Sequence, residues 1–158
     1  MTMPISEADW LDDLEHEAGG DARLGAEKAL LWFRAKECRV DFTGNKKHSL
    51  CINPMVARGV DLNAFLIRGR PPNIEVVHRN IRKHPSFENN DVRIGLFKQI
   101  ESVPGYNSRS KPADGYQPLP LARLIQCSTW DPLEAILEEV IYTLRGRALE
   151  RIDSFSQC

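Results

Sequence analysis

The sequence lacks the features that mark a membrane or secreted protein. Its longest uninterrupted apolar runs are only a few residues, far short of the roughly 20 that cross a bilayer as a helix. The first ten residues, MTMPISEADW, contain no basic region followed by an apolar run, so they show no secretory signal. None of the four cysteines belongs to a Cys-x-x-Cys pair. We therefore expect reduced thiols, a cytoplasmic location and no membrane partner.

Local motifs of catalysis and nucleotide binding are also missing. The chain contains no Gly-x-Ser-x-Gly, no Walker lysine loop and no Gly-x-Gly-x-x-Gly. Asp12 and His16 stand four residues apart, as two metal ligands on one helical face would. Surface helices often carry an acid and a histidine at that spacing, so we predict no metal site, no cofactor and no catalytic residue. Spacing along the chain does not exclude a catalytic site assembled from distant residues.

Composition is that of an ordinary globular protein. The chain has 158 residues, of which 42% are hydrophobic and 27% charged. This length favours one domain with one core. We predict a single globular domain over residues 1–158, with a flexible loop at about 104–120, where Pro, Gly, Ser, Asn and Asp are dense.

The strongest helical pattern lies at residues 131–155. Its apolar residues recur every three or four positions, which indicates one buried stripe. Asp131 suits the N-cap, and Pro132 suits the first helical position. The stripe consists of Leu133, Ile136, Leu137, Val140, Ile141, Leu144, Ala148, Ile152 and Phe155. We predict a long amphipathic helix that crosses the rest of the domain.

Other helices are predicted before this one. The N-terminal residues read as a helical hairpin, with one helix between Ser6 and Gly19 and a second over residues 21–36. Further helices are predicted at 73–84 and at 91–101, the latter with Val92, Leu96, Ile100 and Val103 inward, and a short one within 119–127. Residues 62–68 fit either a helix or a third strand, and we favour the helix.

Residues 38–52 change to the period of a β-strand. Cys38, Val40 and Phe42 alternate with polar residues, as in a strand. Gly44 and Asn45 signal a turn, and residues 49–52 would form the second strand of a hairpin. If Val40 faces Leu50, Cys38 and Cys51 lie on opposite faces, and no disulfide joins them. The predicted fold class is α+β, helix-dominated, with a small antiparallel β-hairpin and a long C-terminal amphipathic helix.

Charge is distributed unevenly along the chain. Residues 1–35 carry eight acidic and three basic side chains, residues 36–125 carry eight acidic and fifteen basic ones, and residues 126–158 carry six acidic and three basic ones. Residues 36–125, which we call the basic middle, can neutralise the acidic ends by packing against them, or their cations can face a binding partner. Charge asymmetry alone does not distinguish these alternatives.

The basic middle supplies the candidate binding residues. Arg79, Arg82 and Lys83 would project from one side of the predicted helix 73–84, where they could neutralise phosphates. The loop at 104–120 adds tyrosines that could stack on bases. It also adds basic side chains that could contact the phosphate backbone of the nucleic acid. The predicted nucleic-acid contacts are Arg79, Arg82, Lys83, Arg93, Lys98, Tyr106, Arg109, Lys111 and Tyr116.

Three function hypotheses follow. The first is a non-enzymatic accessory protein that binds RNA or DNA. Its net charge of −1 differs from the net positive charge that is usual in proteins that bind nucleic acids. The second is a protein-interaction module, such as an adaptor, inhibitor or complex subunit, or a homodimer formed through the terminal helix. The third is a small enzyme whose site is not visible in the sequence.

Overall fold

The protein has an α+β fold in which helices cover one face of an antiparallel sheet. The computed structural model describes residues 6–42, 49–56, 61–106 and 116–146. The strands are β1 (Arg39–Phe42), β2 (Ser49–Asn53), β3 (Phe65–Gly69), β4 (Pro72–Val77) and β5 (Tyr116–Pro120). The helices are α1 (Glu7–Ala18), α2 (Gly20–Ala35), α3 (His78–Ile81), α4 (Asn90–Glu101) and α5 (Cys127–Arg145), with 3-10 turns η1 (Pro85–Phe87) and η2 (Leu121–Ile125). The predicted fold class is confirmed.

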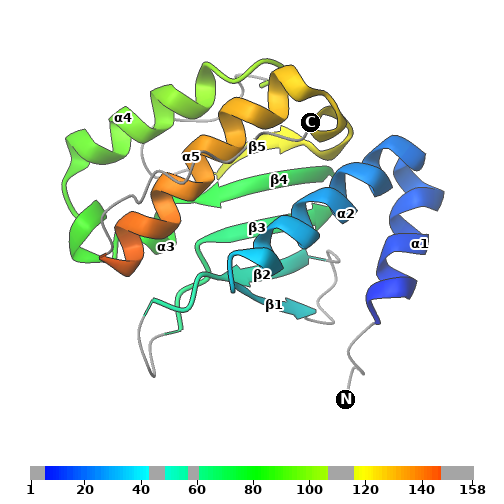
Figure 1. The fold of residues 1–158 in the computed structure, drawn as a ribbon, viewed down its shortest axis with the longest axis horizontal. Coiled ribbons are helices and arrows are strands. Elements are labelled where there is room, and N and C mark those ends of the chain that lie inside the picture. The colour runs from blue at the N-terminus through cyan, green and yellow to red at the C-terminus, as the bar shows by residue number, and fades with distance from the viewer. Residues whose placement is uncertain (1–5, 43–48, 57–60, 107–115, 147–158) are drawn as a thin grey trace.

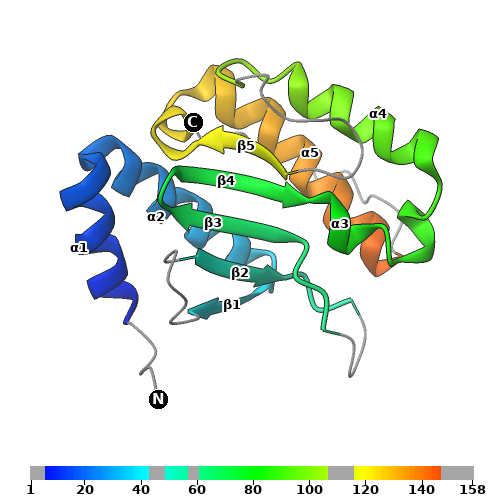
Figure 2. The same cartoon turned by 180° about the vertical axis from the view of Figure 1, so that it is seen from behind.

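The sheet is a meander in the order β1-β2-β3-β4-β5, so each strand pairs with its neighbour in sequence. Helices α2 and α5 lie over one face, and no described helix crosses the other (Figures 1 and 2). A row of buried aliphatic side chains runs across four strands on the helix-covered face. The paired positions are Leu50–Ile67, Ile67–Ile74 and Ile74–Leu119. This row and the apolar stripes of α2 and α5 belong to one core, to which α1 and α4 also contribute buried side chains.

The N-terminal helical hairpin is confirmed. The Ser6 side chain accepts a hydrogen bond of 3.1 Å from the Asp9 amide, which satisfies one of the first-turn donors of α1. Gly19 separates the two helices with a φ of +93°, a conformation that glycine adopts without strain. On α2, Ala22, Ala26 and Ala29 are almost fully buried. This small-residue face lets the helix approach η2 closely.

Two of the predicted helices are wrong. Residues 65–68 of the segment for which a helix was favoured belong to β3, and residues 73–77 of the predicted helix 73–84 belong to β4. The two strands pair directly, with Phe65 opposite Val76 and Ile67 opposite Ile74. β-Branched residues pack well on such a pleated surface. The predicted hairpin is therefore part of a five-stranded sheet, and only a four-residue helix, α3, remains of the helix 73–84.

The β1–β2 hairpin is confirmed, with a different register. Val40 lies opposite Ile52, whereas Leu50 had been expected. The shift is two residues, so every side chain keeps its expected face. Cys38 and Cys51 are free cysteines, as predicted. Cys127, in contrast, is disulfide-bonded, which the expectation of reduced thiols did not foresee.

The C-terminal helix begins earlier than its sequence signals indicate. α5 starts at Cys127, so Asp131 and Pro132 lie inside the helix and Asp131 is not its N-cap. The described helix ends at Arg145, followed by Gly146 with a left-handed φ of +67°. The buried stripe of this helix is confirmed from Leu133 to Leu144, and its predicted continuation lies outside the described residues.

The loop predicted at 104–120 is shorter than expected at its C-terminal end. Residues 116–120 form the edge strand β5, which pairs with β4. Pro118 and Pro120 fit an edge position, because proline has no amide hydrogen to donate to a second neighbour. Residues 107–115 lie outside the described part of the chain.

Candidate nucleic-acid interface

The helix α3 follows β4 directly and carries Arg79, the first of the predicted nucleic-acid contacts. His78 is fully buried, and its Nε2 lies 2.9 Å from Oε1 of Gln117 on β5. The Gln117 side chain in turn donates a hydrogen bond of 2.6 Å to the Phe97 carbonyl on α4. Ile81 is also fully buried. This short helix is therefore fixed to the sheet and to α4 by its inward side chains.

Three cations lie on the outer side of this turn. Arg79, Arg82 and Lys83 are all exposed. The Arg82 amide bonds to the His78 carbonyl at 3.1 Å, so the helical turn continues beyond α3. Residues three and four apart on a helical turn share one side. The three side chains therefore lie on one side of this turn, although the long helix expected to carry them is absent. We call Arg79, Arg82 and Lys83 the basic cluster.

Arg93 does not join this surface. The expectation that its side chain points outward is wrong, because Arg93 is only 9% exposed. Its Nη1 donates hydrogen bonds of 2.7 Å to the carbonyls of Phe87 and Glu88, which fixes η1 against α4. A buried guanidinium with such partners has a structural role. Lys98, on the same helix, is exposed.

The aromatic part of the prediction receives less support. Tyr106 is half-buried and packs against the hydrophobic core, so its ring does not stand out from the surface as a stacking platform would. The backbone of Tyr116 pairs with Val77 in the sheet, but its side chain is not described. Arg109 and Lys111 lie outside the described residues.

Ion pairs show which charges the fold already neutralises. In the acidic N-terminal segment, Arg23 contacts three carboxylates at 2.7–2.9 Å, and Arg34 contacts Glu7 at 2.8 Å. Arg70 from the basic middle reaches Glu17 of α1. Within the described part of the chain, Lys83 and Lys98 take part in no ion pair. The fold thus neutralises Arg23, Arg34 and Arg70 through ion pairs with its own carboxylates.

A buried ion pair lies on the face of the sheet that no described helix covers. Arg68 of β3 and Glu75 of β4 approach to 3.2 Å between Nε and Oε2, and the Glu75 side chain is 5% exposed. Burial raises the pKa of Glu75, because a carboxylate loses its hydration there, and the Arg68 guanidinium partly offsets that rise. Sequence reasoning missed this pair because it predicted helices at 62–68 and 73–84, where these two residues lie on paired strands.

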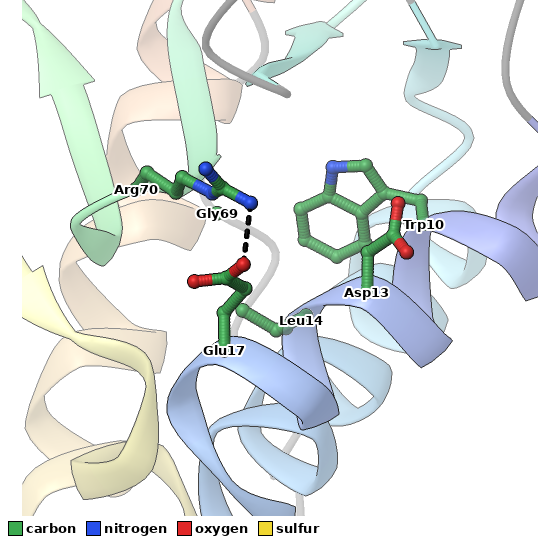
Figure 3. A pocket seen from close by; sticks show the side chains of 6 residues that line it. All are labelled: Trp10, Asp13, Leu14, Glu17, Gly69 and Arg70. Carbon is green, nitrogen blue, oxygen red and sulfur yellow. Dashed lines mark hydrogen bonds and ion pairs between the residues drawn. The ribbon is translucent and has the colours of Figure 1, made fainter.

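The contact between α1 and the β3–β4 turn leaves only a small hollow (Figure 3). Its lining residues are Trp10, Asp13, Leu14, Glu17, Gly69 and Arg70. The cavity volume is about 10 Å³, room for about one water molecule. Figure 3 shows the guanidinium of Arg70 directed at the Glu17 carboxylate across it. This feature fixes α1 to the sheet and is too small for a ligand.

A larger groove lies between α4 and α5, which run side by side in Figures 1 and 2. Its volume is about 350 Å³, within the range of ligand sites. The lining residues are Phe87, Asp91, Val92, Gly95, Leu96, Gln99, Ile136, Glu139, Val140 and Thr143. Val92 had been assigned to the core, but it is 45% exposed. The one sequence signal for this groove is Gly95, a poor residue for the middle of a helix.

Comparison with known proteins adds no functional information. A scan against protein-family models, a search of the curated proteins and a search of the solved structures each find no match to the chain. The helices of the described ranges are too short or too polar to cross a membrane. The same ranges contain no group of three or more His, Cys, Asp or Glu side chains that could hold a metal ion, and Asp12 accepts a hydrogen bond from Arg23.

Proposed function

We propose that this chain binds the phosphate backbone of RNA or DNA through the basic cluster, with Lys98 as an additional contact. The supporting observation is that Arg79, Arg82 and Lys83 are exposed on one helical turn that is fixed to the core by His78 and Ile81. Cations presented on a rigid element lose little freedom when they meet a partner, which favours binding.

The expected interaction is electrostatic and independent of base sequence. Each phosphate that a cation neutralises releases condensed counterions, so affinity falls as salt rises. Four cations would give a log–log slope of about −3.6 on duplex DNA if each met one phosphate. Since Tyr106 packs against the core, the proposal relies on the backbone and not on base stacking.

The test is a salt-dependent binding measurement with labelled single-stranded RNA, single-stranded DNA and duplex DNA. The variant Arg79→Ala, Arg82→Ala, Lys83→Ala should lose most of its affinity and lower the slope by about three. The matched control is Arg34→Ala, Arg70→Ala, Arg123→Ala, which removes the same charge from other exposed positions. The control should bind like the wild type.

The opposite results would reject the proposal. Equal losses in both triple variants would mean that net charge alone determines binding. Wild-type protein that is not retained on heparin at low salt would mean that the cluster meets no polyanion. Thermal unfolding of each variant separates lost binding from lost folding.

A further inference from the structure

The groove between α4 and α5 has the layout of a helix-binding site. On α4 the lining positions 91, 92, 95, 96 and 99 form one stripe, and on α5 the positions 136, 139, 140 and 143 form another. The floor between the stripes is apolar and includes Phe87, Leu96 and Val140. At 1.5 Å per residue the α4 stripe is about 12 Å long, which matches two to three turns of a third helix.

Gly95 lies in the stripe of α4 that lines this groove. A glycine in the middle of a helix destabilises it by about 0.5–1 kcal/mol relative to alanine. Packing within the fold does not explain this glycine, because a Cβ atom at Gly95 would meet no heavy atom within 4 Å. Its φ is not in the left-handed region either. The missing side chain instead leaves room for a partner backbone to approach α4 closely.

The neighbouring residue supports the same interpretation. Val92 lies one helical turn before Gly95 in the lining stripe of α4, and its side chain is 45% exposed although it is apolar. A partner in the groove would cover this side chain together with the groove floor. Apolar contacts of this kind are what an amphipathic helix uses when it lies in a hydrophobic groove.

The charges at the groove indicate the kind of partner. Both charged residues that line it, Asp91 and Glu139, are acidic. Asp91 also suits the first turn of α4, where a carboxylate stabilises the helix dipole. Glu139 lies in the middle of α5, where no such effect applies, and it is exposed. An acidic rim around an apolar floor is complementary to a basic amphipathic segment.

We infer that the α4–α5 groove binds a short amphipathic helix of another protein, one with an apolar face flanked by Lys or Arg. This site is separate from the basic cluster and does not depend on nucleic-acid binding. The two surfaces have opposite charge, so they select different partners. Leu or Met side chains of the partner would contact Leu96 and Val140, and its cations would face Asp91 and Glu139.

The experiment uses a fluorescein-labelled peptide of about 18 residues composed of leucine and lysine. Its leucines repeat at i, i+3, i+4 and i+7, and a scrambled peptide of the same composition is the control. Fluorescence anisotropy should give saturable binding of the patterned peptide to the full chain, with affinity at least about tenfold higher than that of the scrambled peptide. The Gly95 amide resonance should shift on titration.

Two kinds of variant locate the binding. Gly95→Phe fills the groove and should weaken peptide binding by about tenfold or more. Gly95→Ala adds one methyl group where the partner backbone would approach α4, so it should weaken binding to a smaller extent than Gly95→Phe. Asp91→Lys with Glu139→Lys should weaken binding as well and should reduce its salt dependence. The triple alanine variant of the basic cluster should bind the peptide like the wild type, which separates this site from the proposed function.

Three results would overturn the inference. The first is equal affinity for the patterned and scrambled peptides, or no binding of either. The second is unchanged peptide affinity in both Gly95→Phe and the charge-reversal variant. The third is a homodimer in light scattering that Gly95→Phe dissociates, which would assign the groove to a second copy of this chain.

Discussion

Gly25 of α2 lies directly against the backbone of Leu121 in η2. A Cβ atom placed on Gly25 would stand 1.8 Å from the Leu121 carbonyl oxygen and 2.7 Å from its carbonyl carbon. No L-amino acid with a side chain fits this contact without movement of the backbone. The contact fixes the distance between α2 and the segment that leads from the sheet into α5.

Replacing Gly25 should therefore strongly destabilise the protein. Gly25→Ala forces α2 away from η2, and we expect the free energy of unfolding to fall by about 3 kcal/mol or more. Urea unfolding followed by circular dichroism measures this change. Gly95→Ala is the matched control, because it adds the same methyl group at an open position and should raise the free energy of unfolding by about 0.5–1 kcal/mol. Equal effects of the two substitutions would contradict the close contact.

Arg145 joins three elements at the end of α5. Its Nε donates to the Pro54 carbonyl at 2.8 Å, and its Nη2 donates to the Lys36 carbonyl at 2.7 Å. Arg145→Met leaves both carbonyls without this donor, and we expect a loss of about 2 kcal/mol in the free energy of unfolding. Arg145→Lys should restore only part of it, since one ammonium group does not reproduce the two-point geometry of a guanidinium.

The control for this prediction is Arg34→Met. Arg34 also makes a charged contact, to Glu7 at 2.8 Å, but both side chains are more than one-third exposed. Exposed ion pairs contribute about 0–1 kcal/mol. If Arg34→Met and Arg145→Met lower the free energy of unfolding by the same amount, Arg145 has no special role.

Glu75 should make stability depend on pH. Burial raises its pKa in the folded protein above the ordinary value of 4.5, so the folded state binds this proton more tightly than the unfolded state. That contribution is complete below pH 4.5 and is lost as pH rises through the raised pKa. Glu75→Gln keeps the shape without the titration. The free energy of unfolding of this variant, relative to the wild type, should therefore increase between pH 4.5 and pH 7 in denaturant titrations.

A flat difference across that pH range would contradict the prediction for Glu75.

The two free cysteines should differ in reactivity. Burial raises the pKa of Cys38 to about 11, against the opposing effect of the cations Arg145 and Lys36. Burial also raises the pKa of Cys51, but this side chain is only half-buried. Since the thiolate is the reactive form, iodoacetamide at pH 8 should label Cys51 before Cys38 in the native protein. Peptide mapping by mass spectrometry gives both rates, and similar rates in the native state would contradict the burial of Cys38.

Segments whose apolar residues follow a single period were predicted well. The helices α1, α2 and α4 and the β1–β2 hairpin lie where the sequence places them, within one or two residues at most ends. Residues 73–77 carry Ile74 and Val77, spaced as on a helix, but also Ile74 and Val76, spaced as on a strand. Pairing with β3 decided between them, because Ile67 and Phe65 supply matching partners.

The candidate sites were predicted less completely. The exposed positions of Arg79, Arg82 and Lys83 followed from local spacing, but the inward position of Arg93 did not. Its guanidinium is held by carbonyls of η1, whose direction depends on how the chain turns into α4. The α4–α5 groove joins residues about forty positions apart, and no local pattern relates them.

The amino-acid sequence alone determined the α+β class, the N-terminal helical hairpin, the buried stripe of α5 and the charge asymmetry, because each depends on the order of polar and apolar residues along one segment. Tertiary structure decided the five-stranded sheet, the ion pairs that neutralise Arg68 and Arg70, the burial of Arg93 and the groove beside Gly95. These depend on which segments meet. Packing and strand pairing determine which segments contact one another, because contacts between residues distant in sequence outweigh local secondary-structure preference.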